Sequence, residues 1–215
     1  MRDKVIEAID REKIIAIVRG VEAKKLIPLA ESLYEGGIRL LEITYSADGS
    51  VSDNETANNI RVLTEHFSNR MYIGAGTVLT QAQVELTHNA GGKFIISPDT
   101  SQKVIEKTRD MGLVSIPGAL TPSEIREAHT FGADFVKIFP ITNMGVDYVK
   151  AVRAPLSNIR ILAVGGKNEN NLSDYLKAGV CGFGIGSNII DKKALSNDDY
   201  DAICKLAQEY VSKIK

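Results

Sequence analysis

Charge of one sign is almost missing from this sequence, because 26 lysines and arginines stand against 27 aspartates and glutamates. The net charge is −1 at pH 7, and no block of like charge stands out. Proteins that bind nucleic acid or anionic membranes usually carry a basic patch, so the composition argues against both kinds of partner. We expect small-molecule partners instead.

Long apolar runs are missing as well. Runs such as residues 14–18 are far shorter than the roughly 20 residues that cross a bilayer. The opening residues, Met1-Arg2-Asp3-Lys4, are charged and do not resemble the apolar core of a signal peptide. We therefore expect a soluble, cytoplasmic protein with no membrane partner.

Cysteine and histidine are too sparse to indicate a metal site. Cys181 and Cys204 have no C-x-x-C spacing, which favours buried free thiols over a disulfide or metal ligands. His66, His88 and His129 lie in predicted helices, without H-x-x-x-H or facial-triad spacing. We predict no metal ion.

A repeated unit of apolar strand, loop, helix and glycine is what the chain does contain. After a short amphipathic helix near Val5 and Ile9, strands are predicted at 14–19, 40–45, 71–78, 93–98, 113–118, 135–140, 160–166 and 182–187. Helices are predicted at 24–35, 55–67, 81–89, 102–110, 124–131, 146–154, 172–178 and 198–214. Thr80 and Thr121 are predicted N-caps, the latter in a capping box.

Eight strand-helix units with nearly continuous apolar strands predict an α/β fold, a (β/α)8 TIM barrel with a short N-terminal helix. We expect residues 1–215 to form one such domain, since 44% of the residues are hydrophobic and no linker interrupts the repeat. A doubly wound sheet is the rival, suggested by Gly74 and Gly76 after a strand with Asp99 downstream. That pattern lacks its third glycine and comes in the third unit, so we favour the barrel.

Lys137 lies inside the apolar, β-prone stretch 135–140. Strand alternation turns it the same way as Phe135 and Phe139, so an inward face would remove much of its hydration. Desolvation lowers the pKa of an amine, which suits a lysine that forms a Schiff base. The alternative is an edge-strand lysine whose stem reaches to water.

The other strand ends supply candidate partners for Lys137, because TIM-barrel sites lie at the C-terminal ends of the strands. Arg19 ends the first strand, and Glu42 lies in the second with Thr44 and Ser46 beyond it. A buried carboxylate near a buried amine favours a general acid/base, although Glu42 paired with a structural cation is the alternative. Thr77 ends the third strand and offers a hydroxyl to a ligand.

Glycines follow the seventh and eighth strands, where TIM barrels commonly bind phosphate. Gly165 and Gly166 end the seventh strand, and Gly186 and Ser187 end the eighth. Glycines let backbone N–H groups approach an anion, so these four residues are the predicted phosphate site.

Motifs along almost the whole chain resemble the 2-keto-3-deoxy-6-phosphogluconate aldolase family, class I aldolases that also cleave 4-hydroxy-2-oxoglutarate. The matching motifs are residues 15–20, 41–44, 74–79, 96–98, 116–118, 136–140 and 164–166. The resemblance implies Lys137 as the Schiff-base lysine, Glu42 as the acid/base and Thr77, with Thr44 and Pro98, at the pyruvate end. It also implies phosphate contacts from Gly165, Gly166, Gly186 and Ser187, no cofactor, and a homotrimer.

One position departs from the family pattern. The gluconate-type enzymes resemble Glu-x-Thr-x-Arg after the second strand, and Ser46 stands at the place of that arginine. The galactonate-type relatives resemble this chain in having an arginine on the first strand, which implies that Arg19 holds the substrate carboxylate. The preferred epimer is therefore open between the 6-phosphogluconate and the 6-phosphogalactonate.

The resemblance implies cleavage of 2-keto-3-deoxy-6-phosphogluconate to pyruvate and glyceraldehyde 3-phosphate, with the lysine as electron sink. It also implies cleavage of 4-hydroxy-2-oxoglutarate to pyruvate and glyoxylate. Two alternatives remain on the same barrel: a sugar-phosphate epimerase or isomerase, and a non-catalytic phosphosugar-binding protein.

Overall fold

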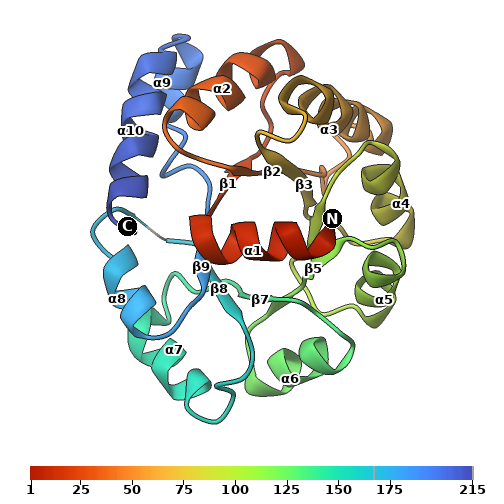
Figure 1. The fold of residues 1–215 in the computed structure, drawn as a ribbon, viewed down its shortest axis with the longest axis vertical. Coiled ribbons are helices and arrows are strands. Elements are labelled where there is room, and N and C mark those ends of the chain that lie inside the picture. Colours follow the sequence, from red (N-terminus) through yellow and green to blue (C-terminus); the bar gives the residue numbers. More distant parts are fainter. Residues whose placement is uncertain (167, 215) are drawn as a thin grey trace.

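Parallel strands form a ring surrounded by helices in this computed structural model, which describes residues 1–166 and 168–214 (Figure 1). The strands are β1 (Ile14–Val18), β2 (Leu40–Thr44), β3 (Tyr72–Gly76), β4 (Phe94–Ile96), β5 (Val114–Ile116), β6 (Gly118–Ala119), β7 (Val136–Ile138), β8 (Ile161–Val164) and β9 (Gly182–Ile185). Their order in the sheet is β5-β4-β3-β2-β1-β9-β8-β7-β6, and every pair is parallel. The predicted α/β barrel is confirmed, and the doubly wound sheet is wrong.

The predicted fifth strand is split into β5 and β6 at Pro117. Proline has no N–H to donate to a ladder, so the regular pairing stops there. The Pro117 carbonyl still accepts the Lys137 backbone N–H at 2.8 Å, while the Ile116 carbonyl accepts that of Ser97 at 3.2 Å. The chain therefore bonds β4 on one side and β7 on the other, which makes the ring nearly closed.

Helices alternate with the strands and cover the outside of the ring (Figure 1). They are α1 (Arg2–Glu12), α2 (Ala23–Glu35), α3 (Asp53–Phe67), α4 (Gln81–Asn89), α5 (Gln102–Asp110), α6 (Pro122–Thr130), α7 (Gly145–Arg153), α8 (Leu172–Lys177), α9 (Lys192–Ser196) and α10 (Tyr200–Ser212). The predicted bounds agree within two residues, except that the short α9 was not predicted. Thr80 and Thr121 each form a full capping box.

The first helix, α1, crosses one end of the barrel instead of lying on its outside (Figure 1). Val5 and Ile9 are fully buried and join the interior cluster that the strands form with residues such as Phe94 and Phe135. An ion pair between Arg2 and Asp134 fixes the helix to the far side of the ring. The N-terminal end of the barrel is therefore closed, and ligands reach the interior from the other end.

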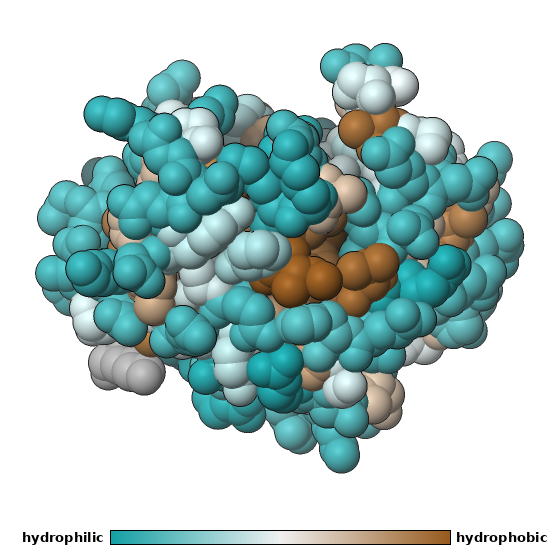
Figure 2. Space-filling model, turned by 90° about the horizontal axis from the view of Figure 1, so that it is seen from above, coloured by the Kyte–Doolittle hydropathy of each residue, from teal (hydrophilic) through white to brown (hydrophobic). Residues whose placement is uncertain are grey.

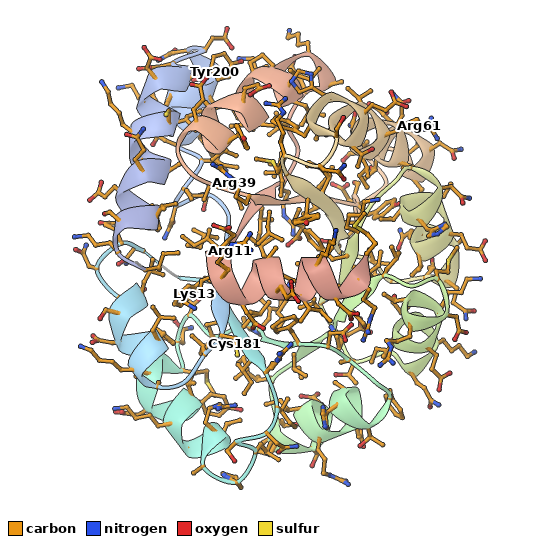
Figure 3. All side chains as sticks on the ribbon, in the orientation of Figure 1. Arg11, Lys13, Arg39, Arg61, Cys181 and Tyr200 are labelled. Carbon is orange, nitrogen blue, oxygen red and sulfur yellow. The ribbon has the colours of Figure 1, made fainter. Side chains whose placement is uncertain are left out.

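The two cysteines correct one expectation. Both thiols are free, but they are half-buried rather than buried. Cys181 packs against the interior cluster near α1, where Figure 3 labels it.

Candidate active site

Lys137 points into the barrel from β7, which is paired on both sides by β6 and β8. The edge-strand alternative is therefore wrong. The lysine is 7% exposed, and its Nζ lies 4.5 Å from the centre of the Phe139 ring. Burial lowers the pKa of its amine, the nearby Glu42 charge raises this pKa by a smaller amount, and Arg19 lowers it further. The balance favours a free amine at neutral pH, as a nucleophile requires.

Glu42 lies in β2 across the barrel opening and is 2% exposed. Its Oε2 atom is buried and has no hydrogen-bond partner in the described residues. Burial raises the pKa of this carboxyl, and the charges of Lys137 and Arg19 oppose that change. A carboxyl with a raised pKa can hold a proton near neutrality, so Glu42 can act as an acid and then as a base.

Neither cation forms an ion pair with Glu42 within residues 1–166 and 168–214, although the charges of Lys137 and Arg19 both act on it. The Lys137 amine and the Glu42 carboxyl therefore face one space without closing it. A substrate carbonyl between them could meet a nucleophile on one side and a proton donor on the other.

Arg19 and Thr77 stand beside this pair at the ends of neighbouring parts of the ring. The Arg19 Nη2 atom donates to the Thr77 Oγ1 atom at 3.2 Å. Thr77 has a φ of 56°, a left-handed conformation that directs the chain away from β3 immediately after Gly76. Arg19 is exposed at the mouth, where a guanidinium can meet a carboxylate of an incoming ligand.

A cavity of about 320 Å³ joins these residues. Every predicted site residue except Thr44 lines it, namely Arg19, Glu42, Thr77, Pro98, Lys137, Gly165, Gly166, Gly186 and Ser187. The prediction missed Ile17, Val164, Gly184, Ile185 and Asn188, which complete the lining with Phe139. Strand alternation could have indicated Ile17, two residues before Arg19, but no sequence pattern marks Asn188.

The glycine loops form one side of this cavity. Gly165 and Gly166 have φ values of 99° and 64°, so their backbone adopts a conformation that side chains disfavour. The helices that follow are short, six residues in α8 and five in α9. Backbone N–H groups and the Ser187 hydroxyl, rather than a long helix dipole, are therefore the groups available to an anion here.

Thr44 and Ser46 line a second cavity, of about 610 Å³, between β1, β2 and the helices α2 and α3. Arg19 lines both cavities. The loop 45–52, expected to belong to the active site, contributes mainly to this second cavity, where Ser46 donates to the Asp48 carboxylate. Figure 2 looks onto the side of α2 and α3 and shows an apolar patch around a hollow in a mostly hydrophilic surface.

Metal-binding groups and membrane spans were searched over the described chain. No three His, Cys, Asp or Glu side chains within it come together in a group that could hold a metal ion. None of its described helices is long and apolar enough to cross a membrane.

Comparison with known proteins places this geometry in a family. The family model for KDPG and KHG aldolase matches residues 5–206. The 2-dehydro-3-deoxy-phosphogluconate aldolase of Haemophilus influenzae is 31% identical over 99% of this chain and 97% of its own length. A probable 2-dehydro-3-deoxy-6-phosphogalactonate aldolase of Rhizobium meliloti is 36% identical over 82% of this chain and 81% of its own.

A solved structure agrees with these matches in sequence. The KDPG aldolase of Legionella pneumophila, with pyruvate captured as a covalent carbinolamine intermediate, superposes with a TM-score of 0.84 at 28% identity. The match covers 97% of this chain and 97% of that one. The chain belongs to the KDPG and KHG aldolase family, and its activity is that of an aldolase.

Proposed function

We propose that this protein is a class I aldolase that cleaves 2-keto-3-deoxy-6-phosphogluconate to pyruvate and glyceraldehyde 3-phosphate through a Schiff base on Lys137. One observation carries the proposal: an amine that is 7% exposed shares a cavity with a carboxyl that is 2% exposed. The name of the family and the pyruvate carbinolamine of the Legionella relative support the same chemistry. By the family name, 4-hydroxy-2-oxoglutarate is the second substrate, cleaved to pyruvate and glyoxylate.

In the proposed mechanism the free amine of Lys137 attacks the C2 carbonyl, and Glu42 donates a proton to the oxygen so that water leaves. The resulting iminium accepts the electron pair of the C3–C4 bond as Glu42 takes the proton of the C4 hydroxyl. The aldehyde departs and leaves an enamine, which is protonated at C3. Water then hydrolyses the iminium, releasing pyruvate and the free lysine. The lysine is the electron sink, so the steps require no cofactor.

The remaining residues divide the substrate between them. Arg19 and Thr77, which hydrogen-bond to each other, would hold the carboxylate next to the iminium, with Pro98 on the same wall. Gly165, Gly166, Gly186 and Ser187 would hold the phosphate on the side of β8 and β9. Thr44 has no place in this assignment, because it lines the other cavity.

The 6-phosphogalactonate epimer is the second candidate substrate, favoured by one specific feature. Ser46 cannot supply the arginine of the gluconate-type pattern, and Arg19 is at the mouth in its place. The 36% identical Rhizobium meliloti relative has a galactonate-type name. Parallel measurements of kcat/KM on the two epimers decide between them.

Trapping with pyruvate and borohydride tests the proposal directly. One reduced pyruvate should appear on the peptide that contains Lys137, should be absent in Lys137→Ala, and should persist in the control Lys150→Ala, whose lysine is exposed on α7. An unlabelled Lys137 in a protein that binds sugar phosphates would refute the Schiff base and favour an epimerase or a binding protein.

A cytoplasmic homotrimer remains part of this proposal. Sedimentation of the purified protein would test the trimer, and a monomer or dimer at assay concentration would contradict it.

A further inference from the structure

The end of β3 lacks a side chain where the Glu42 carboxyl lies. A Cβ atom built on Gly76 would fall 1.6 Å from the Glu42 Oε1 atom, 2.3 Å from Cδ and 2.6 Å from Cγ. Real Cβ atoms essentially never approach other atoms within 3.0 Å. The carboxyl therefore occupies the space that any other residue at position 76 would fill.

We propose that Gly76 is a positioning residue, which sets the location of the acid/base Glu42 opposite Lys137 by leaving this space empty. The inference rests on the proposed function, in which Glu42 transfers the protons. Glu42 has no hydrogen bond that could hold its carboxyl in place, since its Oε2 atom is unpartnered in the described structure. Shape, rather than hydrogen bonding, fixes the carboxyl.

The atoms that a new methyl group would meet belong to the far end of the Glu42 side chain, not to backbone. The barrel can therefore accept Gly76→Ala by moving the carboxyl more than about 1 Å, and a misplacement of that size costs about 10²-fold in rate. Lys137 lies on the other side of the cavity, in β7, and keeps its position.

Gly74 provides the matched control on the same face of β3, two residues earlier. A Cβ at Gly74 would fall 2.3 to 2.5 Å from the ring of Phe94, which is fully buried in the interior cluster. Gly74 therefore serves the packing of a rigid ring, whereas Gly76 serves a side chain that can move.

A double-mutant cycle with Glu42→Ala tests the proposal. Gly76→Ala alone should lower kcat by about 10²-fold while the KM and the extent of pyruvate trapping at Lys137 change little. In the Glu42→Ala background the same substitution should have no further effect on kcat, because no carboxyl remains to be displaced. Gly76→Ala should also lower the Tm of the wild type and raise the Tm of Glu42→Ala, where the new methyl group fills the vacated space. Gly74→Ala should lower the Tm equally in both backgrounds.

Equal losses of Tm for Gly76→Ala in both backgrounds would overturn the proposal and make Gly76 a packing residue like Gly74. Unchanged kcat in the single variant would overturn it too. The Tm cycle does not depend on the reaction, so it tests the placement of Glu42 even for a protein that fails to cleave the proposed substrates, a result that would refute only the proposed function.

Discussion

Removal of the Arg19 guanidinium offers the sharpest test of how the substrate is held. Arg19 donates to Thr77 at 3.2 Å and lies at the mouth of the Lys137 cavity. A hydrogen bond to a charged group contributes about 1.5–3 kcal/mol. Because Arg19 is exposed, water screens it, and the lower half of that range applies. Arg19→Ala should therefore weaken pyruvate binding by about 10- to 30-fold.

The same substitution should change the pH dependence of trapping. The Arg19 charge lowers the pKa of both Lys137 and Glu42. Its loss raises the pKa of the Lys137 amine, so the free amine, and with it the borohydride-trapped adduct, should appear at higher pH than in the wild type. Arg19→Lys keeps the charge but not the planar pair of donors, so it should restore the pH dependence without restoring the affinity.

The assay is the pyruvate concentration that gives half-maximal trapping, measured at several pH values. Arg61→Ala, on α3 outside both cavities, is the control and should behave as the wild type (Figure 3). Adding Ser46→Arg to Arg19→Ala should return part of the affinity, because both positions line the second cavity. Unchanged pyruvate affinity in Arg19→Ala would refute the reasoning and assign the carboxylate to Thr77 and backbone N–H groups.

Four further predictions test the other parts of the site. Glu42→Gln should lower turnover by about 10²–10⁴-fold with little change in pyruvate binding, and wild-type turnover would contradict its role in proton transfer. Ser187→Ala should raise the KM of the phosphorylated substrate alone, by roughly 1–3 kcal/mol; equal damage to 4-hydroxy-2-oxoglutarate would place its role elsewhere. Gly166→Val should damage the same step, but less cleanly, because a Cβ at Gly166 would also come within 2.9 Å of Thr142. Lys137→Met should raise the Tm at pH 7 and lose this advantage as the pH rises: the folded pKa is lowered, so between it and the unfolded value of about 10.4 the unfolded chain binds more protons and the wild type gains stability with pH. A pH-independent difference between the two proteins would contradict the lowered pKa.

The strands were predictable because their signal is local. Each of the eight predicted strands contains an observed one, and strand alternation placed Phe135, Lys137 and Phe139 on one face. The capping boxes at Thr80 and Thr121 were equally local. Such features depend on residues within a few positions of one another, so the sequence contains them directly.

The features that were missed depend on short segments or on packing. The five residues of α9 are too few to show a helical period. Thr44 ends β2, and beyond a strand end the alternation of faces no longer predicts where a side chain lies. It lines the second cavity, which α2 and α3 form together with the strand ends, and no local pattern describes such a space.

The closure of the barrel by α1 has a practical consequence for attaching the protein to a surface. Met1, 65% exposed, precedes this helix, and the mouth above Lys137 is at the opposite end of the ring. A linker at Met1 would orient each immobilised molecule with its mouth toward the solution, so an electrode or bead coated in this way should retain full access for small molecules. A linker in the loop 45–52, beside Arg19, would face the mouth toward the support and obstruct it.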